Sequence, residues 1–169
     1  MSESTLTKDT LVIERFFDAP VALIWQLWTQ PDHFKNWYGP EGFTTFVAKM
    51  DLRIGGQRLI CMETQTPDGS SMKIWTGGEY TEIVPNERLV YIDSLTDENG
   101  NVVSPSAYGM PDDHPATTEV TVLLEDLGGR TKMIMTHVGV PAEEQGANEG
   151  WRQSFAKLAR YIETVLNNA

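Results

Sequence analysis

The chain has 169 residues, a net charge of −11 and an ordinary globular composition, with 40% hydrophobic and 22% charged residues. This length suits one domain with a hydrophobic core, and the acidic balance argues against binding to nucleic acid or to anionic lipid. The single cysteine, Cys61, excludes an internal disulfide and fits a reducing compartment. No apolar run approaches the ~18 residues of a membrane-spanning helix. We therefore expect a cytoplasmic protein that does not bind the membrane.

The first elements are a strand and two short helices. Residues 1–10 are polar, so we expect a flexible leader that is neither a signal peptide nor an anchor, followed by one domain over residues 11–169. An apolar-rich strand is predicted from residue 11 to residue 17. Pro20 then suits the first turn of a helix, and Pro31 interrupts that helix. The apolar residues assigned to the two helices are Val21, Ile24, Trp25 and Trp28 in the first, and Phe34 and Trp37 in the second.

From Phe43 onward the apolar residues alternate with a period of two, which predicts strands. Short turns rich in Gly, Pro and Asn separate most of them, so neighbouring strands should be antiparallel. The exception is the segment 96–116, whose length is typical of a lid or of an excursion from the sheet. The predicted strands cover residues 43–52, 57–66, 72–84, 88–95, 117–126 and 131–138.

The end of the chain has the periodicity of an amphipathic helix. Its apolar residues recur every three or four positions and therefore share one helical face. Such a helix must lay this face on the sheet. The chain therefore predicts an α+β fold, in which a curved antiparallel sheet wraps around a long C-terminal helix and two short helices follow the first strand. The apolar positions are Trp151, Phe155, Leu158, Ile162 and Val165.

Several short motifs, in this order and spacing, resemble the START-like helix-grip superfamily (SRPBCC), in the branch related to the activator of the heat-shock-chaperone ATPase. They are Asp18-Ala19-Pro20, Trp37-Tyr38-Gly39-Pro40, residues 51–56 (DLRIGG), Gly78-Glu79-Tyr80, residues 85–90 (PNERLV), residues 128–131 (GGRT), His137 and Gly150-Trp151. The resemblance implies a helix-grip fold with a hydrophobic pocket between the sheet and the long helix. Relatives of this superfamily bind lipids, sterols or polyketides in that pocket, and a minority catalyse cyclisation or hydrolysis there.

Three functions follow from these observations. The first, which we favour, is binding of a small apolar or amphipathic molecule between the sheet and the C-terminal helix. The second is a cyclase- or hydrolase-type enzyme that uses His137 and a carboxylate. The third is a chaperone-activator type of interaction module. Eukaryotic-type activators carry a separate N-terminal domain, and only the short leader precedes the first strand here, so we do not expect a chaperone contact.

The expected ligand-binding residues are aromatic side chains, adaptable methionines and one histidine. They are Trp37, Phe46, Met62, Trp75, Tyr91, Met135, His137, Trp151, Phe155 and Leu158. His137 should share a strand face with Met133 and Met135, where it is either a structural histidine or a ligand-binding one, and its replacement should change ligand affinity without loss of the fold.

The remaining polar residues have simpler roles. Glu63, Glu79 and Glu82 are more typical of a solvated sheet face, and Arg53 should pair with Asp51 or bind a ligand carboxylate. The widely spaced His33, His114 and His137 do not form a metal-binding pattern, and no nucleotide-binding motif is present, so we expect neither metal nor cofactor. A free strand edge can pair with the same edge of a second copy, so a homodimer is possible.

Overall fold

The computed structural model describes residues 2–7, 10–110, 115–139 and 145–167 of the chain. Within them, eight strands form one sheet in the order β1-β2-β8-β7-β6-β5-β4-β3, with each pair of neighbours antiparallel. The strands are β1 (Ser2–Thr7), β2 (Thr10–Phe17), β3 (Thr44–Met50), β4 (Gln57–Gln65), β5 (Ser71–Val84), β6 (Arg88–Thr96), β7 (Thr117–Asp126) and β8 (Thr131–Val138). The helices are α1 (Val21–Thr29), α2 (Pro31–Phe34), the 3-10 helix η1 (Pro105–Tyr108) and α3 (Gln145–Asn167).

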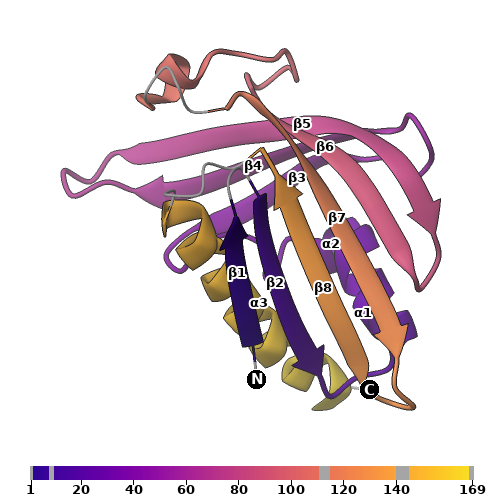
Figure 1. Ribbon diagram of the computed structural model, residues 1–169. Coiled ribbons are helices and arrows are strands. Elements are labelled where there is room, and N and C mark those ends of the chain that lie inside the picture. Colours follow the sequence, from indigo (N-terminus) through magenta and orange to yellow (C-terminus); the bar gives the residue numbers. More distant parts are fainter. Residues whose placement is uncertain (1, 8–9, 111–114, 140–144, 168–169) are drawn as a thin grey trace.

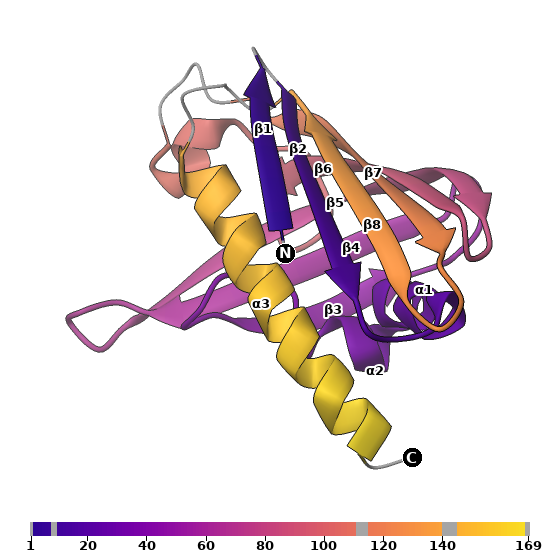
Figure 2. The ribbon, with the colours of Figure 1, turned by 60° about the horizontal axis from the view of Figure 1, so that its bottom comes forward.

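The sheet curves around α3, which runs along its concave face (Figure 1), and the helix crosses the strands obliquely (Figure 2). The predicted helix-grip fold is confirmed. The face of α3 that carries Trp151, Phe155, Leu158 and Ile162 is buried, as its spacing predicts. No helix in these described ranges is long and apolar enough to cross a membrane.

Strand β8 illustrates how alternation directs side chains into the core. Thr131, Met133, Met135 and His137 are buried, and the residues between them are half-buried. Successive side chains of a strand point to opposite faces, so these four face α3 together. The shared face of the two methionines and His137 is therefore confirmed.

The two short helices close one end of the interior. In α1, Ile24, Leu27 and Trp28 are buried, whereas Trp25 is only half-buried. The helix α2 ends at Phe34, so Trp37 lies beyond it rather than within it as predicted. Trp37 is still fully buried, and its indole Nε1 donates a hydrogen bond of 2.9 Å to the carbonyl oxygen of Leu27.

Residues 2–7 form a strand, whereas the sequence predicted a leader over residues 1–10. Strand β1 pairs with β2 from Ser2 opposite Arg15 to Thr7 opposite Thr10. A strand at the edge of a sheet is held mainly by backbone hydrogen bonds on one side, so it does not need the apolar pattern that sequence reasoning relies on. Residues 1, 8 and 9 lie outside the described part of the chain.

The described part of segment 96–116 lies largely on the outer face of the sheet, opposite α3 (Figure 1). A turn built on Asp97 brings Gly100 close to Leu59, which is buried but is not part of the core beneath the sheet. The hydroxyl of Tyr108 accepts a hydrogen bond of 3.0 Å from the amide of Trp75 and donates one to the carbonyl of Thr96. Tyr108 therefore bridges β5 and β6 where the two strands diverge. Residues 111–114 lie outside the described ranges.

Candidate functional site

Seven of the ten predicted ligand-binding residues meet in the interior between the sheet and α3. All seven are buried, and an eighth, Met62, is half-buried and packs against them. The seven are Trp37, Tyr91, Met135, His137, Trp151, Phe155 and Leu158. The structure therefore brings together residues from β6, β8, α3 and the segment after α2, as the helix-grip arrangement requires.

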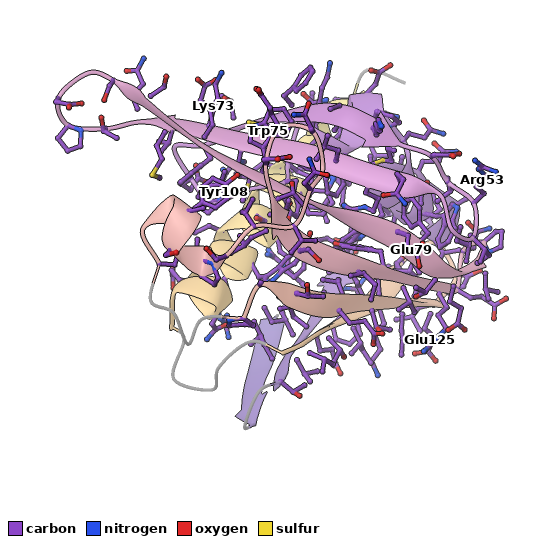
Figure 3. The ribbon with its side chains drawn as sticks, turned by 90° about the horizontal axis from the view of Figure 1, so that it is seen from above. Arg53, Lys73, Trp75, Glu79, Tyr108 and Glu125 are labelled. Atoms are coloured by element: carbon purple, nitrogen blue, oxygen red, sulfur yellow. The ribbon has the colours of Figure 1, made fainter. Side chains whose placement is uncertain are left out.

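The other two predicted residues, Phe46 and Trp75, lie on the outer face of the sheet. They stand in register with Cys61 across β3, β4 and β5, and their rings meet edge to face with centroids 6.4 Å apart. The side chain of Phe46 is 61% exposed, and Trp75 points away from α3 (Figure 3). Their placement in the interior was wrong, because alternation assigns residues to two faces without telling which face the helix covers.

His137 is held through both of its ring nitrogens. Its Nδ1 accepts a hydrogen bond of 3.0 Å from the indole Nε1 of Trp151, and its Nε2 lies 2.7 Å from the hydroxyl of Thr118. Since Nδ1 is an acceptor, Nε2 of the neutral ring carries the proton and donates to Thr118. Thr118 in turn donates to the carbonyl oxygen of Asp93 at 2.9 Å. His137 must break one of these bonds before it can bind a ligand or accept a proton there.

Arg58, on β4, is the interior residue that sequence reasoning missed. Only 2% of its side chain is exposed, and its guanidinium lies over the ring of Tyr91, 3.7 Å from the ring centroid. The rings of Phe34 and Tyr80 surround it at 5.5 Å and 5.8 Å. Alternation on β4 offered a signal, because Arg58 shares a face with Ile60 and Met62.

The nearest carboxylate to Arg58 is Asp93, but the two are not tightly paired. Asp93 Oδ1 lies 3.9 Å from Arg58 Nη1, which exceeds the distance of a direct hydrogen bond. Asp93 Oδ1 and the hydroxyls of Tyr80 and Tyr91 have no hydrogen-bond partner among the described residues. Buried polar atoms are nearly always satisfied in native proteins, so this group of atoms requires an explanation.

The electrostatics of this group follow from its burial. Burial raises the pKa of Asp93 above its ordinary value, although the nearby Arg58 opposes that rise. Burial likewise raises the pKa of Tyr80 and of Tyr91, so both hydroxyls stay protonated. For Arg58, burial lowers the pKa, but the interactions with Tyr91, Tyr80 and Asp93 raise it by a larger amount. The pKa of Arg58 therefore lies above its ordinary value, and the guanidinium remains a cation.

Aromatic side chains connect the Arg58 group to α3. Tyr38 stacks on Phe34 with ring centroids 4.5 Å apart and meets Trp151 edge to face at 5.7 Å. The ring centroid of Trp151 lies 5.4 Å from that of Phe155 in the next turn of the helix. Burial and then the proximity of Asp93 raise the pKa of Tyr38.

The other candidates are located away from this interior. Arg53 pairs with Asp51 at 2.7 Å on the surface, which confirms the simpler of its two predicted roles. Glu79 is exposed, and Glu82 pairs with Arg88 at 2.8 Å. Burial raises the pKa of the Cys61 thiol. In the part of the chain that the structure describes, no group of His, Cys, Asp and Glu could hold a metal ion, and His114 lies outside that part.

Two surface pockets lie near neither Arg58 nor His137. One, of about 500 Å³, is formed by the end of β2 and the last turns of α3, including Phe17 and Ile162. The other, of about 530 Å³, lies beside β3 and β4 near Thr44 and Glu63. Both are open to solvent at the rim of the sheet and lack the clustered aromatic rings of the interior.

Comparisons with known proteins identify the fold and its relatives. The family described as "Activator of Hsp90 ATPase homolog 1-like protein" matches residues 18–163. A crystal structure from Chromobacterium violaceum is 26% identical with a TM-score of 0.75, over 92% of this chain and 97% of that chain. A solution structure from Arthrobacter aurescens is 25% identical with a TM-score of 0.74, over 94% and 88% of the two chains.

A third structure, from Mycobacterium smegmatis, is 22% identical with a TM-score of 0.76 and covers 98% of both chains, which supports the fold alone. A comparison with curated proteins found no match. The helix-grip fold is in general compatible with a domain that binds a small ligand.

Proposed function

The chain belongs to the family of activator of Hsp90 ATPase homolog 1-like proteins, and we propose that it binds a small apolar or amphipathic molecule between the curved sheet and α3. The observation that carries this proposal is the group of buried polar atoms without partners on Asp93, Tyr80 and Tyr91. A core that served only for stability would satisfy these atoms or replace them with apolar ones, because an unpaired buried polar group is costly.

The surroundings of these atoms suit an apolar ligand. Large aromatic rings surround them on one side, and the flexible side chains of Met62, Met133 and Met135 belong to or pack against the same core. Methionine adapts its shape to irregular neighbours, so such an interior can repack around a bound molecule. Known ligand sites combine a mostly apolar lining with a few polar groups in the same way.

The first test compares native and denaturing mass spectra of the freshly purified protein. We expect extra mass in the native spectrum that disappears on denaturation, and extraction would then identify the retained molecule. The location of binding is tested with N-phenyl-1-naphthylamine, a neutral apolar probe, and NMR spectra of the methionine methyl groups. We expect the signals of Met133 and Met135 to shift on titration.

Met72 provides an internal control, because it is exposed on the hairpin between β4 and β5. Its signal should stay unchanged while those of the interior methionines move. A probe that shifted Met72 and left Met133 and Met135 unchanged would contradict an interior site. Absence of any shift, together with no retained mass, would contradict the binding function.

A further inference from the structure

Arg58 and the hydroxyls of Tyr80 and Tyr91 are candidate hydrogen-bond donors in the same part of the interior. A guanidinium has five N–H groups, and Tyr80 and Tyr91 add two hydroxyls without partners. The nearest carboxylate, Asp93, is 3.9 Å from Arg58 Nη1. An acceptor can bind these donors, and the positive charge of Arg58 favours a negatively charged one.

The ring of Tyr91 stabilises Arg58 without using these donors. The guanidinium lies 3.7 Å from the centroid of that ring, and this cation–π contact occupies the face of the planar group. The N–H bonds lie in the plane of the guanidinium and point outward from its edge. Stacking on Tyr91 thus positions the guanidinium and leaves its edge to form two parallel hydrogen bonds with a carboxylate.

Strand β5 brings a hydroxyl close to Arg58. The residue opposite Arg58 on β5 is Gly78, where the backbone of Ile92 leaves no room for a Cβ atom. The next interior residue along β5 is Tyr80, whose hydroxyl is unpaired. The ring of Tyr80 lies 5.8 Å from the guanidinium of Arg58, so its hydroxyl and the guanidinium can bind the same group.

We infer that Arg58, together with the hydroxyls of Tyr80 and Tyr91, binds the carboxylate of an amphipathic ligand whose apolar part lies along Phe34, Tyr38 and Trp151. This inference rests on the proposed function and names its ligand class. The carboxylate forms a bidentate pair with Arg58, as guanidinium and carboxylate geometries favour. The aromatic wall that begins at Phe34 then covers the remainder of the molecule.

Asp93 competes with the ligand for Arg58. Burial raises its pKa, and its 3.9 Å separation from the guanidinium leaves it without the stabilisation of a close pair. A second carboxylate next to Arg58 disfavours the ionised form of Asp93 further, since like charges at short range repel. The charged and titratable groups that face Asp93 are Arg58, Tyr38 and Tyr91. Replacement of Asp93 by the neutral Asn should therefore strengthen binding of a carboxylate.

The test uses isothermal titration calorimetry and two probes with the same naphthalene ring and similar size, naphthalene-2-carboxylate and 2-naphthylmethanol. The protein should bind the carboxylate at least about ten-fold more tightly than the alcohol, as expected for a charge-assisted hydrogen bond. Arg58→Gln should weaken carboxylate binding by about ten- to hundred-fold and leave alcohol binding within about three-fold. Asp93→Asn should strengthen carboxylate binding. Arg53→Gln, which removes an exposed arginine beyond the interior, is the matched control and should change neither affinity.

Arg58→Gln can also fail to fold, so a second measurement uses the unmodified protein. In a ¹⁵N-resolved NMR spectrum, the Nε–H signal of Arg58 should move on addition of the carboxylate and move much less with the alcohol. Equal binding of both probes with shifts at Met133 and Met135 would overturn the carboxylate site and leave the proposed function intact. Binding of neither probe would overturn both. A carboxylate-dependent shift at Arg53 rather than at Arg58 would assign the binding to the surface and overturn the inference.

Discussion

The indole Nε1 of Trp151 donates a hydrogen bond of 3.0 Å to Nδ1 of His137, and this bond joins α3 to β8 across the interior. It determines which nitrogen of the neutral imidazole carries the proton, because Nδ1 can accept only when it is unprotonated. The proton is then on Nε2, which faces Thr118. His137 is thus part of the contact between helix and sheet, which accords with the structural role considered for it from the sequence.

Trp151→Ala should lower the free energy of unfolding by about 3–5 kcal/mol, because it removes a buried aromatic side chain and leaves a cavity in the core. Trp151→Phe is the matched variant, since it keeps an aromatic ring and loses the N–H group together with a smaller part of the apolar area than Trp151→Ala. We expect a loss of about 1–3 kcal/mol for that change. Urea denaturation followed by circular dichroism measures both. Stability like that of the wild type in Trp151→Ala would contradict the packing of α3 on the sheet.

His137→Ala should fold but be less stable by about 1–3 kcal/mol, because the N–H of Trp151 and the hydroxyl of Thr118 lose a partner. The sequence alone predicted no such loss. A double-mutant cycle with Trp151→Phe isolates the pair, and we expect a coupling energy of at least about 0.5 kcal/mol. Additive effects of the two changes would show that the bond contributes nothing. Once a ligand is identified, unchanged affinity in His137→Ala would remove His137 from its site.

Gly78→Ala should be strongly destabilising, because a Cβ atom at this position would lie 2.1 Å from the carbonyl oxygen of Ile92. That oxygen belongs to the backbone of β6 and cannot move without separating β5 from β6. We expect a loss of about 3 kcal/mol, at the upper end of the cost of overpacking. Thermal denaturation measures it, with Glu79→Ala at the exposed neighbouring position as the control. Equal melting temperatures for the two variants would contradict the close approach of the strands.

Asp68, in the turn between β4 and β5, should titrate at a pKa of about 2, below its ordinary value of 3.8. Its carboxylate accepts hydrogen bonds from the hydroxyls of Ser70 and Thr66 and from the amide of Ser70. These bonds favour the ionised form, so their contribution to stability is fully present above pH 3.8 and is lost as pH falls through about 2. Titration of the side-chain carboxyl carbon by NMR checks the value. A midpoint at or above the ordinary value would contradict the hydrogen-bonded turn.

Cys61 should react slowly with iodoacetamide in the native protein, because it is 4% exposed and its burial raises the pKa of the thiol. The segment that follows β6 approaches Leu59, which shares a strand face with Cys61, so we expect it to contribute to this protection. Tyr108→Phe removes the hydroxyl that bridges Trp75 and Thr96, and it should increase the labelling rate. Mass spectrometry of the labelled protein measures the rate, with Ser106→Ala in the same 3-10 helix as the control. Equal rates in the two variants would show that Tyr108 does not hold this segment in place.

The sequence by itself determined the fold and most of its elements, although not β1 or the end of α2. The apolar spacing from Trp151 to Ile162 predicted the buried face of α3, and alternation on β8 placed Met133, Met135 and His137 together. These predictions succeeded because each pattern has one apolar side, and burial of that side is the dominant favourable term in folding.

Only the tertiary structure decided which face of β4 and its neighbours lies inside. On β4, Arg58, Ile60 and Met62 point to the interior, whereas Leu59 and Cys61 point to the outer face and are also buried. Both faces are apolar because the segment after β6 covers the outer one near Leu59. Apolar character therefore could not distinguish them, and so Phe46 and Trp75 were assigned to the wrong side while Arg58 was overlooked. The environment of Arg58 is formed by residues of α2, β5 and β6 that are distant in the sequence, and only the closed fold brings them around one guanidinium.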